Sequence, residues 1–193
     1  MENLKSIIIP AIASTVIKSI NPEKERKKRQ VTDTTKWTFQ SEELKPEYQW
    51  SLIKQMNEKN VSQVKHCHFV SQQIRGKISS YRSQDIDKKI LQQEKLIDED
   101  FVIKLLFDSN NKCYYCKNAV NILYEYVREP KQWSLDRLDN SCGHNKDNVV
   151  IACLNCNLRR KTMYHERFVF TKQLNIVKSG VYTDEHLKRN TPP

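Results

Sequence analysis

The 193-residue sequence contains only three glycines and has no long hydrophobic run. Glycine-rich loops cradle phosphates in many nucleotide-binding folds, and neither a GxGxxG nor a Walker-type motif is present. A membrane-spanning helix needs roughly 18 consecutive apolar residues. The apolar segment 7–17 is shorter and contains Pro10, so it predicts a short buried segment or partner-binding helix rather than a signal peptide or a membrane span. Neither a nucleotide-binding loop nor a membrane partner is expected.

Negative charge is the next scarce feature, because 33 lysines and arginines face 23 acidic residues and give a formal net charge of +10. A basic balance of this size favours a polyanionic partner, of which nucleic acid is the commonest. The cluster KERKKRQ at 24–30 fits a nuclear-localisation or phosphate-binding patch. The competing interpretation of both features is a solvated basic surface with no partner.

The six cysteines lack the arrangement of a secreted disulfide framework. Four of them form two CxxC pairs, and Cys67 and Cys142 stand alone. Two such pairs complete a tetrahedral set of four thiolates that suits structural Zn²⁺. A closed set leaves no position for an activated water, so this zinc holds the scaffold and catalyses nothing. The alternative is a pair of disulfides or redox dithiols. The zinc interpretation predicts a reducing, intracellular location, in the cytoplasm or the nucleus. The four predicted zinc ligands are Cys113, Cys116, Cys153 and Cys156.

Composition divides the chain into an apolar and basic arm at 1–35, a mostly helical basic region at 36–100, a cysteine-bearing domain at 101–180 and a tail at 181–193. In the third region, Asp98 is the expected N-cap of a short amphipathic helix. Strands are expected at WSLDRLD and NVVIAC, followed by a helix that starts within CLNCNLRRKTM. Hairpin followed by helix, after helical N-terminal segments, predicts an α+β fold.

Within the second region, basic residues surround a tyrosine in IRGKISSYRSQDIDKK. Arg75, Lys77 and Arg82 could follow a nucleic-acid backbone while Tyr81 stacks on a base. The same spacing also fits one solvated face of a helix. The pattern leaves both interpretations open.

The segment from Cys113 to Lys161 resembles the HNH (His-Me finger) endonucleases that carry a treble-clef zinc site, including versions in phages and large DNA viruses. The matching motifs are CYYC, WSLDRLDN, GHNKDNVVIAC and CLNCNLRRK, in this order. The resemblance implies a ββα unit that holds one divalent metal, Mg²⁺ or Mn²⁺, against a DNA phosphate. It also extends the expected location to a virus-infected host cell.

By position in that family, Asp136 and Asn157 would be the two ligands of the catalytic metal. Both offer hard oxygen atoms, which Mg²⁺ requires. The metal would polarise the phosphate and stabilise the leaving oxygen. Asn148 would brace the loop between the strands by hydrogen bonds.

The sequence departs from the family at the general base, because Arg137 stands where the family has a histidine. An arginine cannot accept a proton from water. Three accounts of the missing base compete. His144 supplies the base, with an ordinary pKa near 6.5 that suits the role; Arg137 clamps phosphate while water attacks; or the domain binds DNA without cutting it. Simple salt bridging of Asp136 and Asp139 with Arg137 is a further alternative.

The last helix of the motif is basic, with Arg159, Arg160 and Lys161 directly after Asn157. These side chains are expected to contact the DNA backbone, and a solvated helix face is the alternative. The sequence thus predicts a metal-dependent HNH endonuclease that hydrolyses DNA phosphodiester bonds, with a non-catalytic, zinc-stabilised nucleic-acid-binding protein as the second hypothesis.

Overall fold

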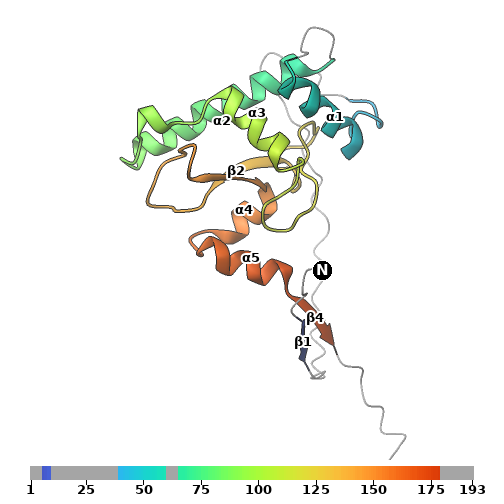
Figure 1. Ribbon diagram of the computed structural model, residues 1–193, viewed down its shortest axis with the longest axis vertical. Helices are drawn as coiled ribbons and strands as arrows, with labels where there is room; N and C mark the ends of the chain where they lie inside the picture. Colours follow the sequence, from blue (N-terminus) through green and yellow to red (C-terminus); the bar gives the residue numbers. More distant parts are fainter. Residues whose placement is uncertain (1–5, 10–38, 60–64, 179–193) are drawn as a thin grey trace, which may run out of the picture. The chain divides into compact units, whose positions relative to one another are not determined.

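The computed structural model describes residues 6–9, 39–59 and 65–178 (Figure 1). The chain divides into two compact units. One unit is Glu25–Lys172, which contains most of the described residues, and the other combines Met1–Lys24 with Gln173–Pro193. The basic cluster 24–30, most of the apolar segment 7–17 and the tail 181–193 lie outside the described residues.

The smaller unit contains a two-stranded parallel sheet. Strand β1 (Ser6–Ile9) pairs with strand β4 (Asn175–Lys178), and Ser6 lies opposite Asn175. The first strand falls in the apolar segment for which the sequence predicted a buried segment or a helix. Its local structure is therefore extended, and its partner comes from the other end of the chain.

The larger unit is built around an antiparallel hairpin, as the sequence predicted. Strand β2 (Trp133–Arg137) pairs with strand β3 (Val149–Cys153), and Trp133 lies opposite Cys153. Side chains alternate between the two faces of a strand. Trp133 and Leu135 join the hydrophobic core, while Ser134 and Asp136 share the opposite face and contact helix α4 (Leu154–Arg160).

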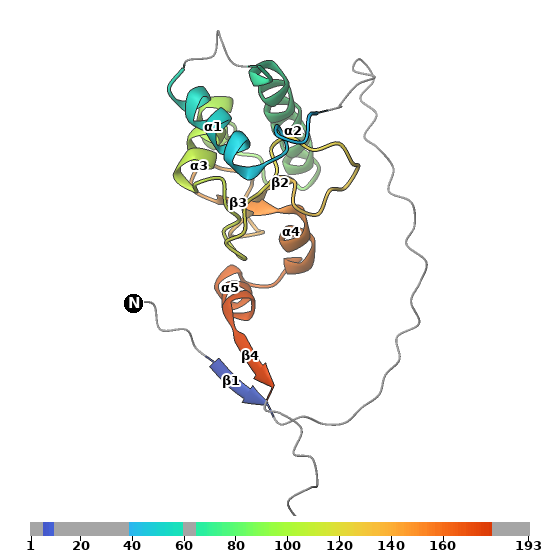
Figure 2. The same ribbon diagram turned by 90° about the vertical axis from the view of Figure 1, so that its right-hand side faces the viewer.

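Helices cover both faces of the hairpin, which explains why β2 is buried from Trp133 to Asp136. Figures 1 and 2 show α1, α2 and α3 gathered on one side and α4 on the other. Helix α3 begins after Asp98, whose side chain accepts a hydrogen bond from the amide of Phe101 at 2.8 Å, as the N-cap prediction required. The remaining elements of this unit are α1 (Pro46–Asn57), α2 (Cys67–Asp87), the 3₁₀ turn η2 (Gln93–Lys95), α3 (Glu99–Asp108) and α5 (His165–Gln173).

The structure confirms a mixed α+β protein with a cluster of four cysteines. The core joins helical residues such as Leu52 and Ile74 to hairpin residues such as Ile151, so the helical region and the cysteine-bearing region share one interior. Among the described residues, none of the helices has the length and apolar character needed to cross a bilayer.

Candidate zinc site and the adjoining carboxylate

The two CxxC pairs come together at one end of the hairpin. Cys113 and Cys116 lie in a tight turn, closed by the amide of Lys117 donating to the carbonyl of Cys113 at 2.9 Å. Cys153 ends β3, and Cys156 lies one helical turn later in α4. Tyr114 donates its amide to the carbonyl of Ile151 at 2.7 Å, which fastens the turn to β3.

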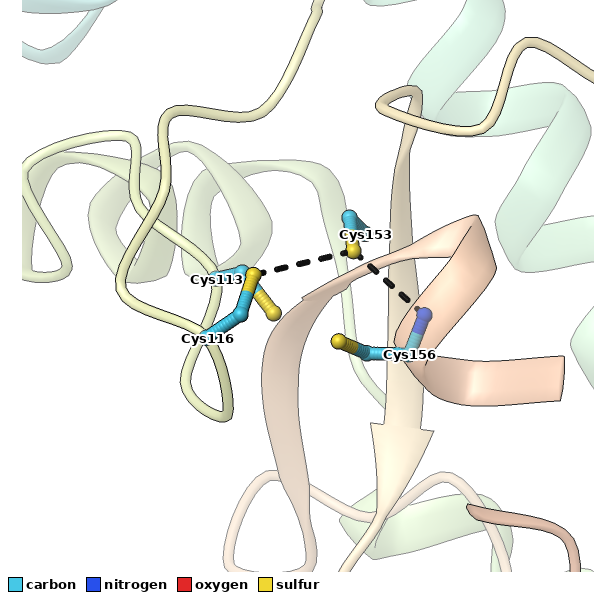
Figure 3. A group of neighbouring side chains, drawn as sticks. All are labelled: Cys113, Cys116, Cys153 and Cys156. Atoms are coloured by element: carbon cyan, nitrogen blue, oxygen red, sulfur yellow. Dashed lines mark hydrogen bonds between the residues drawn. The ribbon is translucent and has the colours of Figure 1, made fainter. Parts of the chain in front are cut away.

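The four sulfur atoms lie within 4.8 Å of one another and can hold a metal ion such as zinc (Figure 3). Figure 3 shows the side chains converging from the turn and from the start of α4. All six cysteines are free thiols, so the disulfide alternative finds no support here. Four thiolates around one point match the donor set of a closed structural zinc site.

The cysteine thiols of the cluster differ in how readily they ionise. A hydrogen bond with Cys153 lowers the pKa of Cys113 to about 5, so one thiolate is already favoured. Burial, together with the charge of Cys113, raises the pKa of Cys156 to about 12. The thiols therefore cannot all ionise without a positive charge between them, and a bound metal would displace their protons.

The carboxylate of Asp136 is paired with the guanidinium of Arg160. Arg160 donates Nε to Oδ2 at 2.6 Å and Nη2 to Oδ1 at 2.9 Å, and the Tyr115 hydroxyl donates to Oδ2 at 2.6 Å. Arg160 is only 2% exposed and Asp136 only 6%. Burial lowers the pKa of Arg160, but the hydrogen bonds and charge of Asp136 outweigh this effect and raise it above its ordinary value. The pair is a buried, bidentate, charged contact.

Three further hydrogen bonds fix the Arg160 guanidinium. It donates to the carbonyls of Met163 at 2.8 Å and Arg137 at 2.6 Å, and to Oδ1 of Asn140 at 3.0 Å. Arg160 was expected to contact DNA, and the structure differs because its side chain is directed to Asp136 and is withdrawn from solvent. Its neighbours Arg159 and Lys161 are exposed.

Asn157 lies in the first turn of α4 beside the same strand. Its Nδ2 donates to the carbonyl of Leu135 and to Oγ of Ser134, each at 3.1 Å. Because a carbonyl accepts this bond, the amide nitrogen must face the strand. Its Oδ1 has no hydrogen-bond donor among the described residues. Asn157 is therefore held against Leu135, the residue that precedes Asp136.

Asn148 braces the loop that joins the strands. Its Nδ2 donates to the carbonyls of Asp139 and Gly143, both at 2.9 Å, and its Oδ1 accepts from the amide of Asp139 at 2.9 Å. Arg137 secures the same loop, because its Nη1 donates to the carbonyls of Asn140 at 3.3 Å and Cys142 at 3.1 Å. The alternative of salt bridging between Arg137 and the hairpin carboxylates is not what the structure describes, because Arg137 makes these backbone contacts and Asp136 pairs with Arg160.

His144 is buried, with 4% of its surface exposed. Its Nδ1 lies 2.8 Å from Oδ1 of Asp85, its amide donates to Oδ2 of Asp85 at 2.6 Å, and its ring stacks on Tyr81 at 4.3 Å. Burial lowers the pKa of His144 despite the carboxylate beside it. A Cβ on Gly143 would lie 2.8 Å from the carbonyl of Ile90, so only glycine lets the loop close on α2. This environment fits a docking role better than the account in which His144 is the general base.

The basic residues predicted on α2 have separate surroundings. Arg75 is exposed with its Nε 3.7 Å from Glu99, and the Nε of Arg82 donates to Gln93 at 3.3 Å. Lys77 donates to the carbonyl of Trp133 at 2.6 Å and lies over the Trp133 ring. Tyr81 is occupied by His144 and accepts the amide of Leu135 at 3.1 Å, so its ring is not free to stack on a base.

Sequence reasoning missed Tyr115, Asp85 and the role of Arg160. One signal was present, since Asn157 and Arg160 are three residues apart and share a face of α4. Tyr115 lies between two zinc-type cysteines, and no pattern indicates its contact with a residue on a strand. Asp85 lies outside the motif altogether. Comparisons with protein-family models, curated proteins and solved structures found no match for this chain.

Proposed function

We propose that the chain is an HNH-type endonuclease that cleaves DNA phosphodiester bonds, with structural Zn²⁺ in the four-cysteine cluster. The proposal rests on the resemblance of the segment 113–161 together with one geometric observation. Asn157 contacts the backbone of Leu135, so the two oxygen-bearing residues that correspond to the family's metal ligands are neighbours on one strand–strand–helix unit. The net charge of +10 suits a DNA substrate.

The residues around Asp136 do not fit a divalent cation in the arrangement described here. A Mg²⁺ or Mn²⁺ ion needs the carboxylate oxygens, and both accept hydrogen bonds from Arg160. The guanidinium would also repel a second cation placed against the same group. Cleavage by the family's route therefore requires Asp136 to exchange Arg160 for the ion.

This contact favours a second candidate, a zinc-stabilised protein that binds nucleic acid without cutting it. The same observation explains how the unit could persist without a divalent metal, because Arg160 already neutralises Asp136. The absence of a histidine at Arg137 and the burial of His144 favour the same candidate.

A cleavage assay separates the two candidates. The zinc-loaded full-length protein is incubated with supercoiled plasmid and Mg²⁺, Mn²⁺ or EDTA, alongside Asn157→Ala and the matched variant Asn155→Ala. Asn155 is exposed on the same helix and its amide only contacts the carbonyl of Pro130. An endonuclease should nick plasmid with metal, stop with EDTA, lose activity with Asn157→Ala and keep it with Asn155→Ala. DNA binding without nicking under any condition would select the binding protein.

A further inference from the structure

Aromatic rings from two separate segments meet on the surface next to the cysteine cluster. Tyr114 comes from the CYYC turn, and Tyr164 and His165 come from the junction of α4 and α5. The ring centroids of Tyr114 and His165 are 6.3 Å apart, and those of Tyr164 and His165 are 4.8 Å apart. We call these three residues the aromatic strip.

The outer end of the aromatic strip is open to solvent. Tyr164 is 62% exposed, the largest exposed fraction among the exposed large hydrophobic side chains of the described residues. Its ring and that of His165 are inclined by 49°, so the histidine does not cover the tyrosine face. A tyrosine held in this way by a neighbouring ring, with its face exposed, can receive another flat ring.

Basic residues lie in both segments that carry the aromatic strip. Lys117 holds its ammonium 5.1 Å from the centroid of the Tyr114 ring. Arg159, Lys161 and Arg167 are exposed, and no ion pair of theirs is found among the described residues. Glu166 is the one acidic residue in the segment 159–172, and it leaves the local balance strongly positive.

The aromatic strip adjoins the loop that follows Asp136. Nδ2 of Asn140 donates to the backbone carbonyl of Lys161 at 3.3 Å, which joins the turn before Tyr164 to that loop. A chain bound along the strip would therefore continue towards the end of β2 that bears Asp136 and Arg137.

We propose that the aromatic strip binds single-stranded nucleic acid, with an unpaired base stacked on Tyr164 and the backbone phosphates on the surrounding cations. Exposed rings among cations suit unpaired bases, because a base in a duplex keeps its faces covered by its neighbours. The inference rests on nucleic acid being the partner, as in the proposed function, and it adds that the bound segment is unpaired.

The test is fluorescence anisotropy with a single-stranded DNA of about 12 nucleotides, a length within the range of known single-strand sites, and with the duplex of the same sequence. The zinc-loaded full-length protein is compared with Tyr164→Leu and with the matched variant Tyr164→Phe. Loss of one stacked base should weaken single-strand binding about fivefold to a hundredfold in Tyr164→Leu. Tyr164→Phe keeps the ring and should bind like the wild type, and duplex affinity should change less than twofold in both variants.

The salt dependence of binding provides a second measurement. Lys161→Gln should reduce the slope of log affinity against log salt by about 0.7 for the single strand, the value for one lost phosphate contact. An equal loss with Tyr164→Phe and Tyr164→Leu, an equal loss for duplex, or wild-type affinity in Tyr164→Leu would overturn the inference. So would a dimer in sedimentation that Tyr164→Leu dissociates, because a second copy would then be the occupant.

The outcome is separable from that of the proposed function. Tyr164-dependent binding without plasmid nicking would leave the aromatic strip established and remove the endonuclease. Metal-dependent nicking by a protein that fails to bind the single strand at low salt would do the reverse.

Discussion

The cysteine cluster and the Asp136 site lie on the same strand–strand–helix unit. They differ in the source of the positive charge that can balance their buried anionic groups. At the cysteine end, four thiols converge on one point; the pKa of Cys113 is lowered and that of Cys156 is raised, so a metal ion taken from solution would supply the positive charge that lets both ionise. At the other end, Asp136 is neutralised by Arg160 from the same helix. Helix α4 thus carries Cys156, which can bind a metal ion from solution, and four residues later Arg160, which pairs with a carboxylate of the same unit.

Of the variants that distinguish the two ends, removal of a predicted zinc ligand should have the largest effect on folding. Cys156→Ser should lose the metal and unfold the hairpin, because metal binding in such sites contributes about 10–16 kcal/mol and is coupled to folding. Elemental analysis and amide NMR spectra would measure both effects. Cys142→Ser is the matched control, since Cys142 lies outside the cluster. A folded, zinc-loaded Cys156→Ser protein would contradict the assignment of its ligands.

The next largest effect should come from lowering the pH, which should act on the cysteine cluster. Zinc requires thiolates, and the folded pKa of Cys113, about 5, lies below its ordinary value, so this thiolate is present above that pH and is lost as the pH falls through it. Cys156, with a pKa near 12, must lose its proton to the metal. Zinc retention should therefore fall as the pH falls through about 5, and zinc binding near neutral pH should release protons. Dialysis at a series of pH values and calorimetry in two buffers would measure these effects, and constant retention would argue against thiolate ligands.

Arg160, the cation that pairs with Asp136, can be replaced separately. Arg160→Met should destabilise the protein by about 3–5 kcal/mol, because it leaves the Asp136 carboxylate buried without its partner. Urea unfolding of the zinc-loaded protein would measure the loss. Arg159→Met is the matched control on the same helix and, being exposed, should change stability by less than about 0.5 kcal/mol.

A double variant tests whether Arg160 stabilises the protein through Asp136. Asp136→Leu combined with Arg160→Met removes both charges, and it should recover much of the stability lost by Arg160→Met alone. A double variant no more stable than the single one would show that Arg160 acts through its backbone contacts and packing instead of through Asp136.

The smallest expected effect tests the link between the two ends. Tyr115 lies between Cys113 and Cys116, yet its hydroxyl donates to Asp136. Tyr115→Phe removes one hydrogen bond to a charged group and should cost about 1.5–3 kcal/mol in urea unfolding, with zinc content unchanged. Tyr114→Phe is the control, because the Tyr114 hydroxyl makes no hydrogen bond with the described residues. Equal stability of the two variants would argue that Arg160 alone neutralises Asp136.

The local elements and the set of four cysteines follow from the amino-acid sequence alone. The N-cap at Asp98, the strands on either side of the loop and the CxxC spacing all depend on neighbours within a few residues, and patterns report such relations. The partners of Asp136 and His144 depend on the tertiary structure. Arg160 and Tyr115 reach Asp136, and Asp85 and Tyr81 reach His144, from other parts of the fold. Which buried charge meets which cation is a matter of three-dimensional packing that spacing along the chain does not encode.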